Sequence, residues 1–290
     1  MTASEAIRKL GIGEKAFNRL RAHLHPTRSY GTVNQFEHFS NDEIAELANV
    51  LSDRVTAGAV AERLGISYHG VEQLCCYGLI SPVEDKRIQE TFRDFQIVGT
   101  SVDRLCTDLY DRLLPSAEGE ALIALRRAVD IIGAREKPWA AIFRAILSGS
   151  LMTFKGAASK RYIQHAQVRL TDLRQIADMS FAAADFPDFE FATTINQRDS
   201  AEILNVLPRH SSGIFRSELQ NVLGKGGHYP KSAILDLARQ RISGLELKRR
   251  WFPDISRPQF GYFDPFDRLG ASGFCRETVE TYMARQEQSQ

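Results

Sequence analysis

Cysteine, long apolar runs and net charge are all scarce in this chain. Its four cysteines, Cys75, Cys76, Cys106 and Cys275, form no Cys-x-x-Cys pair and have no histidine at metal-ligand spacing. We therefore expect reduced, mostly buried thiols and neither a zinc site nor a disulfide framework. No apolar run approaches the roughly 20 residues that a membrane helix needs, and the N-terminus lacks the apolar core of a signal peptide. These absences predict a cytoplasmic protein with no membrane partner.

Motifs for catalysis and cofactor binding are also missing. The seven histidines are scattered, and the closest pair, His23 and His25, would diverge on a helix because the two are only two residues apart. The segment GKGGHYPKS lacks the Gly-Lys-Ser/Thr ending of a phosphate-binding loop, and no strand is predicted before it. We therefore expect a protein that is not an enzyme and that binds no cofactor or metal.

The formal net charge of +1 conceals a segregation of charged residues along the chain. Lys and Arg outnumber acids by six to two in 1–30, seven to one in 135–169 and eleven to six in 198–257. By contrast, 31–52 and 175–194 each carry four acids and no Lys or Arg. Basic faces are therefore expected to alternate with acidic ones.

A helix-turn-helix pattern occurs twice with identical spacing. SEAIRKLGIGEKAFNRL and GAVAERLGISYHGVEQL share Leu-Gly-Ile, followed by Phe17 and Leu20 or by Val71 and Leu74. Each predicts a helix that ends at a glycine with positive φ, a short turn, and a second helix with a buried i, i+3 face. A looser copy, RDSAEILNVLPRHSSGIFRSEL, has Asn205 in the glycine position, where Asn is the next-best residue.

An aromatic residue followed five positions later by Ile or Val marks a second repeat. The pairs are Phe39/Ile44, Phe92/Ile97, Tyr229/Ile234 and Phe274/Val279. We interpret the aromatic as the end of a hairpin strand and the aliphatic residue as part of a third helix. The turn-rich segments before each aromatic have room for the hairpin. Helix, turn, helix, hairpin, helix is the winged-helix order.

The predicted fold is mainly α with short β-hairpins, arranged as a tandem array of winged helix-turn-helix-like modules. The predicted units are 1–52, 53–113, 114–184, 185–240 and 241–290, of which the third and fifth are divergent. In the third unit, EALIALRRAVDIIGAREKPWAAIFRAILSGSL predicts two helices, the second with Trp139, Phe143 and Ile146 on one stripe. Val168 and Leu173 then repeat the plus-five spacing with an aliphatic in the aromatic position.

The second helix of a helix-turn-helix can lie in the major groove, with its first residues facing base edges. The candidates for such contacts are Lys15, Asn18 and Arg19 in the first unit, Ser67, Tyr68, His69 and Gln73 in the second, and Arg209, His210, Ser212 and Arg216 in the fourth. Gln, Asn and Arg can form bidentate contacts with bases, whereas Ser and Lys suit phosphates. The alternative for any one of them is a solvated polar position.

Basic hairpin tips are the second set of candidates. They are Arg28 in the first unit, Lys86 and Arg87 in the second and Lys225 in the fourth. The segment KGAASKRYIQHAQVR adds Lys160 and Arg161, which fit either a phosphate-binding surface or a solvated hairpin. Basic tips that follow the DNA backbone or minor groove contribute salt-dependent affinity, although charge on a turn is also common in proteins without a DNA partner.

Three motifs resemble those of a known family. AVAERLGISYHGVEQLCCYGLI, PWAAIFRAILSGSL and TTINQRDSAEILNVLPRH are similar to the C-terminal helix-turn-helix region of the TniQ family, whose members select insertion sites for certain bacterial DNA transposons. Members of that family generally begin with a Cys/His zinc domain, and this chain has no such cluster. The resemblance implies binding to double-stranded DNA or to an RNA-guided complex, and recruitment of a transposition ATPase or transposase.

The predicted function is a DNA-binding adaptor that resembles a transposition target-site selector. A second interpretation is a protein-interaction scaffold that docks a transposition ATPase or guide complex without reading bases, which the near-neutral charge and the acidic stretches favour. A third is a phage or plasmid helix-turn-helix regulator, for which a dimer on a palindrome is expected. The first two differ in salt response, because binding through several phosphates weakens steeply with salt.

Overall fold

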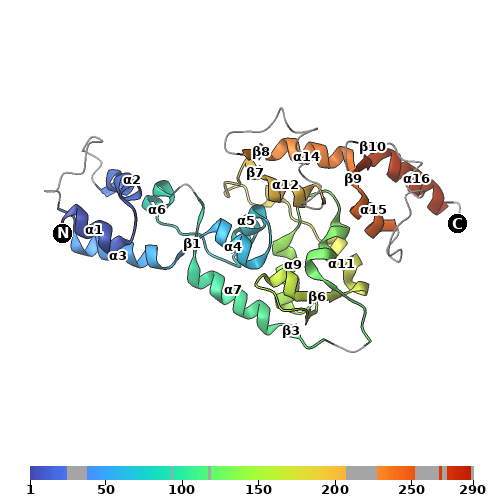
Figure 1. Cartoon of the computed structure of the whole chain (residues 1–290), viewed down its shortest axis with the longest axis horizontal. Helices are drawn as coiled ribbons and strands as arrows, with labels where there is room; N and C mark the ends of the chain where they lie inside the picture. The colour runs from blue at the N-terminus through green and yellow to red at the C-terminus, as the bar shows by residue number, and fades with distance from the viewer. Residues whose placement is uncertain are drawn as a thin grey trace.

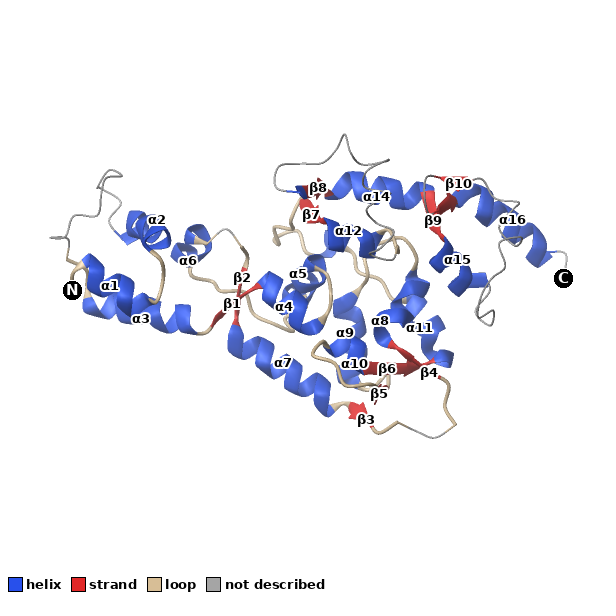
Figure 2. Cartoon of the chain, viewed as in Figure 1, coloured by secondary structure: helices blue, strands red, loops and turns tan. Residues whose placement is uncertain are grey.

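The computed structural model describes residues 1–24, 38–92, 94–116, 119–206, 227–251, 268–269 and 273–288. The elements are arranged along one long axis, with the N-terminal helices at one end and the C-terminal helices at the other (Figure 1). Helices dominate, and the strands between them are short and mostly antiparallel (Figure 2). The predicted mainly α class with short antiparallel strand pairs is therefore confirmed.

The bounds of the elements are as follows. The α-helices are α1 (Ala3–Leu10), α2 (Glu14–Leu24), α3 (Asn41–Ser52), α4 (Ala57–Leu64), α5 (Tyr68–Cys76), α6 (Lys86–Thr91), α7 (Gly99–Asp111), α8 (Leu125–Ala128), α9 (Trp139–Ser148), α10 (Tyr162–His165), α11 (Leu173–Asp178), α12 (Gln197–Ile203), α14 (Lys231–Gln240), α15 (Gly244–Trp251) and α16 (Arg276–Gln288). The 3-10 helices are η1 (Val129–Ile132), η2 (Leu170–Asp172) and η3 (Ala183–Asp185). The strands are β1 (Arg54–Thr56), β2 (Gln96–Val98), β3 (Leu113–Leu114), β4 (Leu122–Ala124), β5 (Thr153–Lys155), β6 (Ala166–Arg169), β7 (Thr194–Asn196), β8 (His228–Pro230), β9 (Arg241–Ser243), β10 (Arg268–Leu269) and β11 (Gly273–Cys275).

Four antiparallel strand pairs, β1–β2, β4–β6, β7–β8 and β9–β11, have the same arrangement. Both strands of each pair run directly into a helical segment, so a strand and a helix alternate along the chain. The central residues that face each other across the pairs are Val55 and Ile97, Ile123 and Val168, Ile195 and Tyr229, and Ile242 and Phe274. An isolated bridge between Thr2 and His38 stands before α1 and α3 in the same way. The repeat in the sequence therefore corresponds to a recurring strand pair with its two following helices.

The plus-five spacing joins the second strand of each pair to a buried position in the next helix. The pairs Val168/Leu173, Tyr229/Ile234 and Phe274/Val279 follow this rule. The predicted register of Phe92/Ile97 was wrong, because Ile97 lies at the centre of β2 and its plus-five partner is the buried Val102 of α7. Phe92 instead follows α6, where the Arg54 guanidinium lies 3.8 Å from its ring centroid.

Left-handed residues end the helices where the sequence predicts them. Gly11 after α1 has φ 62° and Gly65 after α4 has φ 85°, and their backbone N–H groups donate to the preceding turn. Asn205 after α12 has φ 55°, which makes it the one non-glycine residue with positive φ in the described part of the chain. The prediction that Asn205 replaces the glycine as a left-handed cap is confirmed.

The segment after α5 differs from the predicted hairpin wing. Residues 86–91 form helix α6, which Asp85 caps by accepting from the Arg87 N–H at 2.9 Å. Val83 and Ile88 are buried in the core formed by α1, α2 and α3. The hairpin prediction is therefore wrong here, because this part of the second unit packs on the first unit and completes its core.

The predicted helix over the first part of EALIALRRAVDIIG is also wrong. Residues 122–124 form strand β4, followed by the short helix α8 and by η1. Ile123 pairs with Val168 of β6 within a four-stranded sheet of order β3-β5-β6-β4, in which β3 and β5 run parallel. The strand partner lies far along the chain, so local periodicity gave no sign of it.

Hydrophobic cores follow the order of the units, but the second and third units share one. Most buried apolar residues between Ala57 and Ile176 form a single cluster, although Val83 and Ile88 belong to the core of α1 to α3. Smaller clusters hold α12 with α14 and α15 with α16. All four cysteines are free thiols; Cys106 is buried and the other three are half-buried, so burial is less general than predicted.

Candidate nucleic-acid interface

The first predicted helix-turn-helix corresponds to α1 and α2, and part of α2 is open to solvent. Phe17 and Leu20 face the core, while Lys15 is exposed and Asn18 and Arg19 are half-buried. The Asn18 Oδ1 and Arg19 Nε atoms have no hydrogen-bond partner among the described residues. Three of the predicted contact residues therefore lie on one helix, with Lys15 the most accessible.

The second predicted helix-turn-helix corresponds to α4 and α5, and the polar face of α5 is buried. The side chains of Ser67, His69 and Gln73 are 1%, 2% and 1% exposed. Tyr68 is half-buried, and burial raises the pKa of its phenol to about 12. The prediction that Ser67, His69 and Gln73 face DNA is wrong for this conformation, because other parts of the chain cover them.

Helix α9 covers α5 from one side. The Gln73 side chain donates to the Lys137 carbonyl at 3.1 Å and accepts from the Ala140 N–H at 3.4 Å. A Cβ on Gly70 would lie 2.6 Å from Trp139 Cδ1, so the helices approach too closely for a larger residue at this position. Gln73 is therefore a bridge between α5 and the start of α9.

Helix α12 covers α5 from a second side. The Tyr68 N–H donates to Asp199 Oδ2 at 2.8 Å, and the Trp139 Nε1–H donates to Glu202 Oε1 at 2.9 Å. His69 Nε2 lies 3.1 Å from Ser67 Oγ and 3.8 Å from the same Glu202 oxygen. Burial raises the pKa of the Asp199 carboxyl, while His69 acts in the opposite direction. These polar groups join the second, third and fourth units.

Residues 130–139, here called the junction segment, extend this network to the fourth and fifth units. The Asp130 carbonyl accepts from Asn205 Nδ2 at 2.8 Å, and the Ala134 N–H donates to Glu246 Oε2 at 2.9 Å. Glu136 forms a 2.5 Å ion pair with Lys231 of α14. The junction segment therefore contacts α5, α14, α15 and both α12 and the residue Asn205 that follows it.

Lys137 lies at the centre of the junction segment, and its side chain is 1% exposed. Its ammonium donates to the Gly133 carbonyl. Burial lowers the pKa of Lys137 to about 8, with the nearby Glu202 and Asp130 acting in the opposite direction. Lys137, Trp139 and Glu202 were not among the predicted functional residues, because the contact between Trp139 and Glu202 spans 63 positions of the sequence and the burial of Lys137 depends on the fold.

The basic segment 155–161 lies between β5 and α10. Lys155 and Lys160 are exposed, whereas Arg161 forms a 2.6 Å ion pair with Glu62 of α4. A Cβ on Gly65 would lie 3.2 Å from Arg161 Cβ and 2.8 Å from Ile163 Cγ1 of α10, so the end of this segment and the start of α10 pack against the turn between α4 and α5. Lys160 stays available for a phosphate, and Arg161 mainly joins two units.

Lys86 and Arg87 start helix α6 instead of forming a hairpin tip. Lys86 is exposed, but the Arg87 guanidinium lies 2.6 Å from Asp85, 3.4 Å from Glu43 and 3.0 Å from Glu46. Asp85, and to a smaller extent Glu46, raise the pKa of Arg87 above its already high ordinary value. Arg87 thus joins α6 to α3, and its charge is already neutralised by carboxylates.

The other predicted contacts lie outside the described residues, so their prediction stays open. They are Arg28, Arg209, His210, Ser212, Arg216 and Lys225.

Two further features bear on the class of protein. Among the described residues, no group of three or more His, Cys, Asp and Glu side chains is placed to hold a metal ion. None of the described helices has the length and apolar character needed to cross a membrane.

Comparison of the chain with protein families, with curated proteins and with solved structures found no match in any of the three.

Proposed function

We propose that the chain is a DNA-binding adaptor built from winged helix-turn-helix-like modules, in which the modules have divided their roles. The recurring strand pair supports a tandem array, since in each copy both strands lead directly into a helical segment. The α1–Gly11–α2 and α4–Gly65–α5 segments supply the helix-turn-helix of the first two modules.

The observation that carries the proposal is the contrast between α2 and α5. The two helices share a sequence pattern, but α5 uses its polar face to hold other units, whereas α2 leaves Lys15 exposed. Residues 1–24 contain five Lys or Arg and two acids, so α2 belongs to a cationic end of the array. A cationic helix-turn-helix with an open second helix suits the major groove and the phosphates beside it.

Lys155 and Lys160 supply a second cationic surface in the third unit. Two modest DNA contacts on one chain reinforce each other through effective concentration. The resemblance to transposition target-site selectors adds the proposal that the rest of the array recruits a transposition ATPase or transposase, or docks to an RNA-guided complex. The proposed partners are therefore double-stranded DNA and one such protein assembly.

Fluorescence anisotropy with a labelled mixed-sequence duplex tests DNA binding at about 50 and about 200 mM salt. We expect binding that weakens by at least about tenfold between these salt concentrations and that Lys15→Glu weakens further at the lower salt. Arg239→Glu is the matched control, because it makes the same charge change at an exposed position of α14. Absence of binding at the lower salt, or equal effects of both variants, would count against the proposal.

A protein-interaction scaffold is the second candidate, and the burial of Ser67, His69 and Gln73 favours it. If the polar face of α5 contacts other parts of the chain instead of DNA, the corresponding faces of other units can contact a partner protein in the same way. This candidate predicts no salt-sensitive DNA binding, but stable association with a protein partner in high salt. The same titration therefore separates the two functions.

A further inference from the structure

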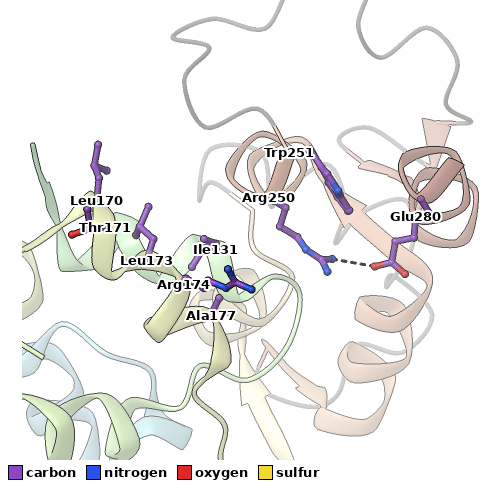
Figure 3. Close-up of a pocket in the computed structure, with 10 residues that line it drawn as sticks. Ile131, Leu170, Thr171, Leu173, Arg174, Ala177, Arg250, Trp251 and Glu280 are labelled. Atoms are coloured by element: carbon purple, nitrogen blue, oxygen red, sulfur yellow. Dashed lines mark hydrogen bonds and ion pairs between the residues drawn. The ribbon is translucent and has the colours of Figure 1, made fainter. Parts of the chain in front are cut away.

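An open groove of about 670 Å³ separates the third unit from the fifth (Figure 3). One side is formed by η1, η2 and α11, and the other by α15 and α16. Leu173 and Trp251 provide apolar surface from opposite sides, and Leu170 on the rim is 45% exposed. A groove of this volume can receive two or three side chains of a partner.

Most of the charge in this interunit groove is already balanced. The Arg250 guanidinium lies 3.1 Å from Glu280 and 3.4 Å from the buried Glu246. Arg276 approaches the same two carboxylates, at 2.8 Å from Glu246 and 3.2 Å from Glu280. Two guanidinium groups therefore face two carboxylates, and this set needs no further counterion.

Arg174 is the charged residue of the groove that these ion pairs do not include. It is exposed on α11, lines the groove, and has no carboxylate within ion-pair distance among the described residues. The groove thus combines apolar walls with one uncompensated guanidinium, a group that binds carboxylates in bidentate geometry. A ligand that matches both features needs an apolar side chain and a carboxylate a short distance apart.

We propose that the interunit groove binds an acidic peptide segment of a partner protein, with a Leu or aromatic side chain between α11 and α15 and an Asp or Glu on Arg174. A free inorganic anion would leave the apolar walls of the groove exposed, and a nucleic-acid strand offers no aliphatic side chain to cover Leu170 and Leu173. The proposal does not depend on DNA binding, because none of the residues that line the groove is among the proposed DNA contacts.

Selection from a displayed library of random dodecapeptides on the full chain tests the proposal. The library is first depleted on Ala284→Trp, which places a bulky side chain into the groove from an exposed position of α16. We expect the recovered peptides to combine Asp or Glu with Leu, Phe or Trp. Recovery of only basic or wholly polar peptides, or no enrichment after depletion, overturns the proposal.

A recovered peptide is then synthesised with a fluorophore and titrated against variants of the full chain. Arg174→Glu and Leu170→Ser should each raise the Kd of the peptide roughly tenfold, which corresponds to the loss of one charged hydrogen bond or one apolar contact. Arg127→Glu is the control, because it reverses an exposed charge on α8 that does not line the groove. Circular dichroism confirms that each variant is folded. Equal Kd for Arg174→Glu and wild type would contradict the assignment of the carboxylate.

Discussion

Lys137 shows how single residues hold this chain together. Its ammonium is removed from water and faces the Gly133 carbonyl, with the carboxylates of Glu202 and Asp130 nearby. Removing a charge from water destabilises the charged form unless partners replace the lost hydration. Here the replacement is incomplete, because the pKa of Lys137 falls from 10.5 to about 8.

This lowered pKa predicts a pH dependence of stability. Between about pH 8 and 10.5 the unfolded chain keeps the Lys137 proton more than the folded chain does, so the Lys137 contribution to the unfolding free energy rises with pH. Urea unfolding of wild type and Lys137→Met at about pH 7 and about pH 10 measures that contribution as a difference. The unfolding free energy of wild type relative to that of Lys137→Met should be higher at about pH 10 than at about pH 7. A difference independent of pH would show that the ammonium keeps its ordinary pKa.

Gly70 allows a direct test of the contact between α5 and α9. A methyl group at Gly70 would meet Trp139 at 2.6 Å, so Gly70→Ala should lower the unfolding free energy by about 1–3 kcal/mol through overpacking. Gly58→Ala is the matched control in α4, because its nearest neighbour would lie 3.9 Å away. The control should be neutral or up to about 1 kcal/mol more stable, since Ala favours helix. Equal thermal stability of the two variants would contradict the close packing.

Helix α6 lies in the second unit by its position in the sequence, but it packs against the helices of the first unit. Ile88 of α6 is fully buried in the core of α1 to α3. Ile88→Ala should therefore lower stability by about 2–5 kcal/mol and increase hydrogen exchange of α2. Lys86→Ala, at an exposed position of the same helix, should leave exchange of α2 unchanged. Faster exchange in α4 and α5 alone after Ile88→Ala would place α6 in the second unit after all.

Local sequence patterns predicted the elements whose causes are local. The Leu-Gly-Ile pattern located two helix ends, because positive φ is a property of the residue itself, and Asn205 followed the same rule. The stripe of Trp139, Phe143 and Ile146 correctly predicted a buried helix face. Strand β4 was missed because its partner β6 lies more than 40 residues away.

The candidate site was less predictable, because it depends on contacts between units. A polar stretch such as Ser67–Gln73 has the same composition whether it faces solvent, DNA or another part of the chain. Its partners are distant in sequence: Gln73 bonds a residue 64 positions away, and Tyr68 bonds one 131 positions away. Residues without such partners, Lys15 and Lys160, remain exposed as predicted.

In the whole molecule, the junction segment of the third unit contacts the second, fourth and fifth units. Its contacts with α12, α14 and α15 involve buried or half-buried groups, including Glu246 and Lys231. The first unit joins the second through α6, whose Ile88 is buried in the core of α1 to α3. Under our proposal, these contacts set the separation between α2 and the surface at Lys155 and Lys160. Under our proposal, the target DNA has to match that separation for both surfaces to bind together.

Under the proposed function, α2 contacts DNA whereas α5 holds other units of the chain. Hydrogen exchange of the full chain, measured with and without duplex DNA at low salt, tests both parts at once. We predict that DNA slows exchange in residues 14–24 and near Lys160, whereas residues 68–76 exchange slowly with or without DNA. Protection by DNA in 68–76 but not in 14–24, or no DNA-dependent change at all, would contradict the proposed function.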